Sequence, residues 1–359
     1  MYSYILKKLF YSSLVIYGVL TIVFFLFNVL PGDPARMMLD KREDSKQLAL
    51  IKKKYGFDKP ILHQYFYYLN DVSPLSFHET KNEKSLNYLN AKKYNFTKIY
   101  DFKNTAVVFK FPYLRTSFVK TGVPVSKIIS STFFNTFFLA CASIIFALIF
   151  GIFFGVISAL SKDSLFDRLI LYFSVIGMAL PSFFSSIIVA WVFGYLLHNY
   201  TGLNMYGSLY VLDDYGISNS LVLKNLLLPA FTLGIRPLAV IVQLSRNSLL
   251  EVLSMDYIRT AHAKGLNKKI VIFKHALRNS LNPVITAISG WFASLLAGAV
   301  FVEYIFAWNG LGKEIVDALN NMDLPVVMGS VLFISIIFIV INILVDLIYM
   351  LVDPRIKIE

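Results

Sequence analysis

The stretch from Arg246 to Pro283 reads RNSLLEVLSMDYIRTAHAKGLNKKIVIFKHALRNSLNP and lies between two long apolar runs. It carries many basic residues against only two acidic ones, Glu251 and Asp256. A short, strongly basic segment between two membrane spans stays on the cytoplasmic side of the bilayer. This polar loop, residues 246–283, therefore predicts a membrane protein that presents an ordered surface to the cytoplasm.

The residue pattern inside the polar loop predicts two short helices. Ser254 or Asp256 can cap the first helix, and Gly265 can end it in the left-handed conformation. Asn267 can cap the second helix. Four apolar residues of the second helix are predicted to share one face: Ile270, Phe273, Leu277 and Leu281. The basic residues fall mostly elsewhere, which suits a surface held by a cytoplasmic partner.

Composition favours membrane insertion. Hydrophobic residues make up 57% of the chain and charged residues 16%, whereas a soluble domain has roughly a quarter charged residues. The net charge of +12 is compatible with nucleic-acid binding, but no nucleic-acid module is recognisable, so we expect no nucleic-acid partner. The single cysteine, Cys141, excludes a disulfide framework within the chain.

A transmembrane helix needs about 20 mostly apolar residues. The qualifying segments, with a few residues of error at each end, are Leu9–Leu30, Thr132–Leu160, Leu169–Leu197, Leu226–Leu244, Val284–Ile305 and Val326–Leu351. The first has too long an apolar core, and no small-residue cleavage site, for a signal peptide. Pro181 is predicted to kink the third span.

Short-loop charges predict the orientation, because Lys and Arg concentrate on the cytoplasmic side. The basic residues near both termini, after the second span and in the polar loop all fall on one side. Both termini are therefore predicted to be cytoplasmic. The long segment from Pro31 to Ser131 is Lys-rich yet predicted to be external, since the charge rule does not govern loops above about 60 residues.

The segment between the first two spans has a mixed pattern. Asp40–Tyr68 alternates charged and apolar residues, which predicts one or two short helices. Val107–Phe111 is strand-like. The lysines and aromatic residues of the stretch from Ser76 to Pro112 suit contact with an acidic protein surface, and a solvated decoration is the alternative.

Several motifs resemble those of the dipeptide/oligopeptide branch of ABC-importer permeases, in one order along nearly the whole chain. They are PGDPA at 31–35, YGFDKP at 55–60 with Gln64-Tyr65, TGVPV at 121–125, YIRTAHAKGL at 257–266, HALRNSLNP at 275–283, EYIFAWNGLG at 303–312 and DPR at 353–355. Arg259-Thr260-Ala261 replaces the Glu-Ala-Ala of the general importer loop, a change common in this branch. Asn309 stands where the family usually has Pro, and residues 76–112 have no family counterpart.

The resemblance implies an all-α integral membrane protein with six transmembrane helices and the type I ABC importer permease fold. An external α/β or irregular insertion is expected between helices 1 and 2. Residues 1–30 would form the cytoplasmic N-terminus and first helix. Residues 31–131 would form the external segment, with its insertion at about 76–112, and residues 132–359 a five-helix core that carries the polar loop.

The resemblance also implies partners and a location. We expect a second homologous permease subunit, two ATP-binding cassette ATPase subunits and an external substrate-binding protein, in a bacterial inner membrane. The chain lacks a G-x-x-x-x-G-K-[ST] phosphate loop, and Gly310–Lys313 is only a partial match. ATP hydrolysis is therefore expected in a separate subunit, and this chain is predicted not to be an enzyme.

Within the polar loop, the resemblance points to residues that contact the ATPase. They are Tyr257, Arg259, Thr260, Ala261, Lys264, Gly265, Lys268, Lys269, His275 and Arg278. Lys268 and Lys269 have an alternative role, in which they orient the loop or contact anionic lipid.

Four residues are candidates for a translocation path: Pro181, Ser182, Arg236 and Glu303. For each an ordinary structural role stays open. Pro181 and Ser182 could serve packing, Arg236 could snorkel outward, and Glu303 could be a solvated interface residue. Phe306 and Trp308 are expected to be aromatic residues of the membrane interface.

Other function classes are poorly supported by the sequence. An intramembrane hydrolase would need a G-x-S-x-G or H-E-x-x-H motif, and neither occurs. A transporter working alone would need an intramembrane charge relay, for which the charges are too few. The scattered histidines predict no metal site, and no cofactor is expected. Peptides are the usual cargo of the branch, with nickel chelates, glutathione or sugars as alternatives.

Overall fold

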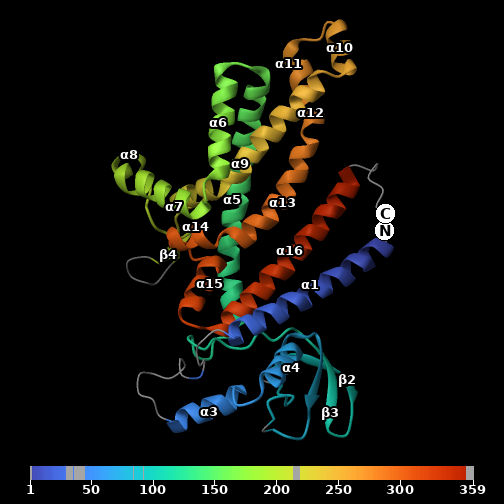
Figure 1. The fold of residues 1–359 in the computed structure, drawn as a ribbon, viewed down its shortest axis with the longest axis vertical. Helices are drawn as coiled ribbons and strands as arrows, with labels where there is room; N and C mark the ends of the chain where they lie inside the picture. The colour runs from blue at the N-terminus through green and yellow to red at the C-terminus, as the bar shows by residue number, and fades with distance from the viewer. Residues whose placement is uncertain are drawn as a thin grey trace. The chain divides into compact units, whose positions relative to one another are not determined.

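The computed structural model describes residues 2–29, 35, 45–83, 85–91, 93–212 and 219–352 (Figure 1). The chain divides into two compact units. Unit one comprises Met1–Ser131 with Ile315–Ile336, and unit two comprises Thr132–Glu314 with Ile337–Glu359. Helices dominate both units, as the sequence predicts. The Pro-Gly-Asp-Pro run at 31–34 and the Asp-Pro-Arg run at 353–355 lie outside the described residues.

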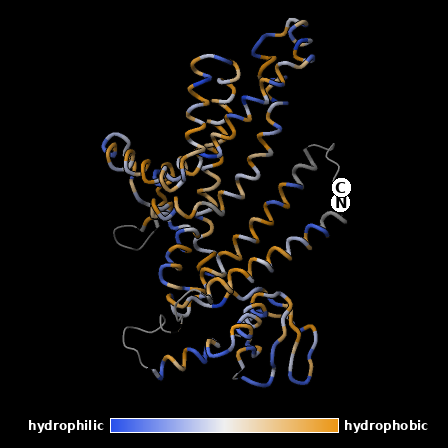
Figure 2. Tube along the Cα trace, viewed as in Figure 1, coloured by the Kyte–Doolittle hydropathy of each residue, from blue (hydrophilic) through white to orange (hydrophobic). Residues whose placement is uncertain are grey.

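Four helices among the described residues are long and apolar enough to cross a membrane. They are α1 (Tyr2–Val29), α5 (Val125–Leu160), α9 (Lys224–Leu253) and α16 (Leu324–Val352). These helices coincide with the first, second, fourth and sixth predicted spans. Figure 2 shows the hydrophobic colour running along α5 and α16, as expected for segments that face lipid or a helix neighbour.

The third predicted span is broken rather than kinked, which corrects the prediction. It consists of α6 (Leu165–Ala179), followed by α7 (Ser182–Val189) and the π-helix η1 (Ala190–Leu196), and the two parts are inclined by 110°. Leu180 adopts an extended conformation with φ −72° and ψ 130°. A residue before proline avoids the helical region, and Pro181 has no N–H to continue the helix, so α6 ends and α7 begins here.

The fifth predicted span is also divided. It comprises α13 (Asn282–Gly298) and α14 (Val300–Ile305). The remaining elements of unit two between α7 and α9 are short: α8 (His198–Thr201), β4 (Tyr210–Leu212) and β5 (Asn219–Leu221). After α14 the chain continues into α15 (Leu311–Asn320).

Two glycines on α5 allow α9 to approach closely. Gly151 and Gly155 are four residues apart and therefore lie on one face of α5. A Cβ atom on Gly155 would stand 2.6 Å from the Cβ of Ser245, and one on Gly151 would stand 2.7 Å from Cγ2 of Ile241. This is the small-xxx-small pattern that brings membrane helices into backbone contact. The close packing of α5 against α9 therefore requires residues without side chains at positions 151 and 155.

Unit one contains α3 (Ser45–Tyr55), α4 (Ile61–Val72) and a three-stranded antiparallel sheet of β1 (Leu75–Glu79), β3 (Thr105–Lys110) and β2 (Phe96–Asp101), in that spatial order. The short helices and the strand near residues 107–111 confirm the predictions for this segment. Phe24 of α1 packs on Tyr65 and Tyr68 of α4, with ring centroids 5.2 and 5.6 Å apart. An aromatic cluster therefore joins α1 to α4.

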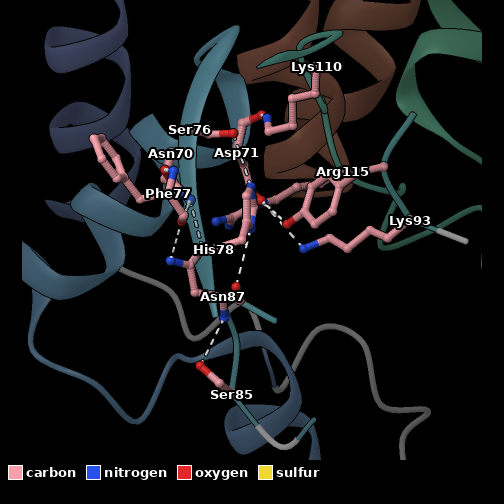
Figure 3. A network of polar contacts seen from close by, with 11 residues as sticks. Asn70, Asp71, Ser76, Phe77, His78, Ser85, Asn87, Lys93, Lys110 and Arg115 are labelled. Atoms are coloured by element: carbon pink, nitrogen blue, oxygen red, sulfur yellow. Dashed lines mark hydrogen bonds and ion pairs between the residues drawn. The ribbon is translucent and has the colours of Figure 1, made fainter. Parts of the chain in front are cut away.

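The sheet of unit one buries a face that mixes apolar and polar residues. The inward side chains are Ser76, His78, Ala106, Val108 and Lys110. On the opposite face, Phe77 and Phe109 are 59% and 58% exposed. Lys110 donates a hydrogen bond to the backbone carbonyl of Asp71, and Figure 3 shows this contact within a wider polar network. Buried polar groups are stable only when paired, and this network pairs the polar side chains of the inward face.

Candidate functional site

A buried ion pair stands at the base of the polar loop. Arg246, its first residue, donates from Nε to Oδ1 of Asp167 at 2.7 Å and from Nη2 to Oδ2 at 2.7 Å. Ser158 of α5 donates to the same carboxylate. The Asp167 side chain is 3% exposed. A bidentate guanidinium–carboxylate pair fixes both distance and angle, so it ties α9 to α6 and α5 where the loop begins.

The first loop helix, α10 (Asp256–Ala263), begins one residue away from the predicted caps. Met255 occupies the N-cap position without a side-chain hydrogen bond. The Ser254 hydroxyl instead donates to the Glu251 carbonyl at 2.7 Å, at the end of α9. Both predicted caps are therefore wrong. The predicted left-handed termination is confirmed, because Gly265 has φ +74°.

The second loop helix is assembled from α11 (Lys268–Ile270), the π-helix η2 (Val271–Ala276) and α12 (Leu277–Ser280). The predicted cap is confirmed, since Oδ1 of Asn267 accepts from the backbone N–H of Lys269 at 3.1 Å. In Figure 1, α10 and α11 stand at the same end of unit two as the turn from α5 to α6.

The π-helix changes which apolar residues of the loop are buried. Val271 and Ala276 are fully buried against Leu249 of α9 and Val156 of α5. Ile270 and Phe273, predicted to lie on one face with Leu277 and Leu281, are instead 45% and 61% exposed, whereas Leu277 and Leu281 are half-buried. A π-turn adds a residue per turn, so a face assigned from a period of 3.6 residues drifts out of register.

The residues predicted to contact an ATPase lie mainly on the outside of the loop. Ala261 is buried and His275 is half-buried. The other predicted residues are exposed: Tyr257, Arg259, Thr260, Lys264, Gly265, Lys268, Lys269 and Arg278. With exposed Ile270 and Phe273, they form a mixed basic and apolar surface on a loop whose inner face is packed. Such a surface suits docking of a protein partner.

The four path candidates come from three helices and differ in exposure. Pro181 is exposed at the break between α6 and α7, with Ser182 half-buried beside it. Arg236 is exposed on α9. Glu303 is fully buried in α14, so its interpretation as a solvated interface residue is wrong. Its place on a path stays a prediction.

Glu303 holds the turn that follows α14. Its Oε1 accepts from Oγ1 of Thr136 at 2.6 Å, and its Oε2 accepts from the backbone N–H of Lys313 at 3.0 Å. Trp308 is completely buried, and its Nε1 donates to the Asn135 carbonyl at 3.1 Å. Phe306 is also buried, so both aromatic residues belong to the core and their assignment to the membrane interface is wrong.

Sequence reasoning missed Asp167 and Thr136 as organising residues. Thr136 both donates to Glu303 and accepts from the backbone N–H of Leu311 at 2.8 Å. Asp167 and its partner Arg246 are 79 residues apart in the sequence. Thr136 and its partner Glu303 are 167 residues apart. Nothing local in the sequence marks such pairings. A lone acid at the start of an apolar helix was the available signal for Asp167.

Comparisons with known proteins identify the family. Residues 151–358 match the family model described as "Binding-protein-dependent transport system inner membrane component", and residues 1–84 match its N-terminal membrane-component model. The chain is 31% identical to the dipeptide transport system permease protein DppB of Alkalihalophilus pseudofirmus, over 99% of this chain and 100% of that protein. It is 32% identical to the oligopeptide transport system permease protein AppB of Bacillus subtilis, over 99% and 100%.

A third relative is the glutathione transport system permease protein GsiC of Escherichia coli, which is 30% identical over 99% of each chain. The chain therefore belongs to the family of binding-protein-dependent transport system inner membrane components. It is a multi-pass membrane permease of an ABC importer.

Replacing Asp167 by Ala would leave Arg246 without its partner. Removing one member of a buried ion pair costs about 3–5 kcal/mol, so we expect Asp167→Ala to lower the thermal unfolding temperature of the purified protein. Asp256→Ala is the matched control, because the Asp256–Arg259 pair is 95% and 78% exposed. Surface pairs contribute little to stability. Equal unfolding temperatures for the two variants would contradict a structural role for the Arg246–Asp167 pair.

Proposed function

We propose that this permease imports di- or oligopeptides delivered by an external substrate-binding protein. The observation that carries the proposal is the full-length similarity to permeases named for dipeptide and oligopeptide transport. A second candidate substrate is glutathione, itself a tripeptide, which is supported by the 30% identity to the glutathione permease. All three cargoes share a peptide backbone and a free carboxylate.

ATP hydrolysis is assigned to two separate ATP-binding cassette subunits, and a second, homologous permease completes the membrane part. The absence of a phosphate-binding loop from the sequence supports this division of labour. The polar loop is the docking element for one ATPase. Its exposed basic and apolar residues would enter a groove on that subunit, while Val271 and Ala276 keep the loop packed on α5 and α9.

This arrangement provides a mechanical route from the ATPase to the spans. Movement of the docked loop is transmitted through the packed inner face and through the Arg246–Asp167 pair to α9, α6 and α5. Close-packed interfaces move as rigid bodies rather than deform continuously. Rigid-body rocking of these helices would then alternate access to a central path.

The substrate is tested by transport in proteoliposomes that contain the assembled importer and its binding protein. We expect ATP-dependent uptake of a labelled dipeptide, and ATPase activity that the loaded binding protein stimulates. Uptake of glutathione without uptake of dipeptides or longer peptides would support the second candidate and overturn the first.

Gly265→Val tests the docking role of the polar loop. Gly265 has φ +74°, and a Cβ atom added there would meet no other atom within 4 Å, so the substitution acts through backbone strain of about 1 kcal/mol or more. We expect weaker ATPase binding and slower transport, with membrane insertion unchanged. Gly122→Val is the matched control for ATPase binding, because Gly122 has φ +78° and equally open surroundings but lies in unit one. Normal ATPase binding by Gly265→Val would defeat the docking proposal.

The proposed orientation places both termini and Lys264 in the cytoplasm, and the segment between α1 and α5 outside. Single cysteines at Lys264 and Lys103, both exposed, are introduced into a Cys141→Ser background. An impermeant thiol reagent added to intact cells should label the cysteine at 103 and spare the one at 264. The opposite pattern would show that the charge asymmetry has been assigned to the wrong side.

A further inference from the structure

A cavity of about 510 Å³ lies within unit one, beside α4 and the chain that follows the sheet. Aromatic rings line much of its wall: Tyr55, Phe57, Tyr67, Tyr68, Tyr113 and Phe118. The volume falls in the range of roughly 300–1,000 Å³ that small-molecule sites occupy, and such sites combine apolar walls with a few charged groups. The dimensions therefore suit a ligand the size of a short peptide.

The charged groups in the cavity wall carry an excess of positive charge. Lys54, Lys93 and Arg115 contribute three cations against the single carboxylate of Asp71. Both oxygens of that carboxylate are occupied, because Oδ1 accepts from the Tyr94 hydroxyl at 2.7 Å and Oδ2 accepts from Nε of Arg115 at 3.0 Å. We therefore do not expect Asp71 to bind an amino group of a ligand.

Figure 3 shows Lys93 and Arg115 pointing toward Asp71 from different parts of the chain. Burial opposes ionisation of Asp71, but the charges of Arg115 and Lys93 outweigh it and hold the pKa of this carboxyl below its usual range. Lys93 is also fixed by the Tyr94 and Tyr113 rings, 4.6 and 4.8 Å from its Nζ. Lys93 is thus a structural cation, not the solvated lysine that suits a protein-docking surface.

Arg115 retains its outer edge for another partner. Its Nε binds Asp71 and its guanidinium lies 5.7 Å from the Tyr68 ring centroid. Among the described residues, the Arg115 side chain donates a hydrogen bond only through Nε, and Nη1 and Nη2 donate none. These two nitrogens form the fork that matches a planar carboxylate.

The backbone at Arg115 is strained. Its φ of +65° lies in the left-handed region, which a residue with a side chain rarely adopts. The conformation is held by the hydrogen bond from the Val125 N–H to the Arg115 carbonyl, at 3.1 Å. Strain of this kind concentrates where a side chain is positioned for a ligand.

We propose that this cavity is a binding site for the free carboxylate end of a short peptide. The carboxylate pairs with the outer edge of Arg115 and with Lys54, and the last side chain of the peptide packs on the aromatic wall. The ligand chemistry follows from the lining residues, while its setting in peptide import rests on the proposed function. The charged lining residues all come from the segment between α1 and α5, and Leu324 and Met328 of α16 complete the wall.

Binding is measured by calorimetry on the full chain in lipid nanodiscs, without ATPase or binding protein. The probes are the dipeptide Ala-Phe, its carboxyl-terminal amide and its N-acetyl form. The amide lacks the charged carboxylate that would accept hydrogen bonds from Arg115, whereas the other two probes keep it. We therefore expect the affinity of the amide to be lower by a factor of about ten or more. The N-acetyl form should bind like Ala-Phe, because Asp71 does not take part.

Two variants locate the site. Arg115→Lys keeps the charge beside Asp71 but loses the fork, and Lys54→Gln removes the exposed cation. Each should weaken Ala-Phe binding about tenfold. Lys53→Gln is the matched control, because Lys53 is exposed beside Lys54 but does not line the cavity. Unchanged unfolding temperatures verify that the variants are folded.

The proposal is overturned by equal binding of Ala-Phe and its amide, by loss of binding on N-acetylation, by wild-type affinity in both variants, or by no binding of Ala-Phe. These results leave the import function intact, since uptake in proteoliposomes is a separate measurement. A permease that binds Ala-Phe here but imports no peptide would instead retain the site and overturn the proposed function.

Discussion

The bidentate pair between Arg246 and Asp167 is the constraint on which the polar loop depends. The pair lies where the apolar part of α9 ends and the polar loop begins. The Asp167 carboxylate also accepts a hydrogen bond from Ser158 of α5. An unpaired charge at this depth would be costly, so the three helices must keep their ends together. Because the pair is directional, it sets the angle of the loop as well as its attachment. A hydrophobic contact alone would allow the loop to slide.

The packing of α5 against α9 provides the second half of this arrangement. Gly151 and Gly155 let the two backbones approach, and van der Waals contact replaces the hydrophobic effect that is missing between helices in lipid. Farther along, Val156 of α5 and Leu249 of α9 support Val271 and Ala276 of the loop. On α9, Ile241, Ser245 and Leu249 are four residues apart and share one face, which contacts α5 and then supports the loop.

Local signals in the sequence predict much of this fold. The length of the apolar runs locates the spans. The end of α10 at Gly265 and the cap of α11 at Asn267 are also predicted, because each is decided by residues a few positions away. The errors arise where longer-range contacts or irregular turns decide. The π-turn of η2 shifts Ile270 and Phe273 outward. Burial of Trp308 depends on contacts with residues more than 170 positions earlier in the chain.

The sheet of unit one shows the same limit, because its buried face carries Ser76, His78 and Lys110 beside Ala106 and Val108, whereas Phe77 and Phe109 are exposed. A slip of one residue in a strand exchanges its faces. A slip of β1 would bring Phe77 inside in place of His78, and a slip of β3 would bring Phe109 inside but turn Ala106 and Val108 outward. The bonds of His78 with the Asn87 carbonyl at 3.2 Å, and of Lys110 with the Asp71 backbone, oppose such slips. Directional polar contacts therefore act together with the burial of Ala106 and Val108 in fixing the register, and the Lys110 contact holds Asp71, whose carboxylate anchors Arg115.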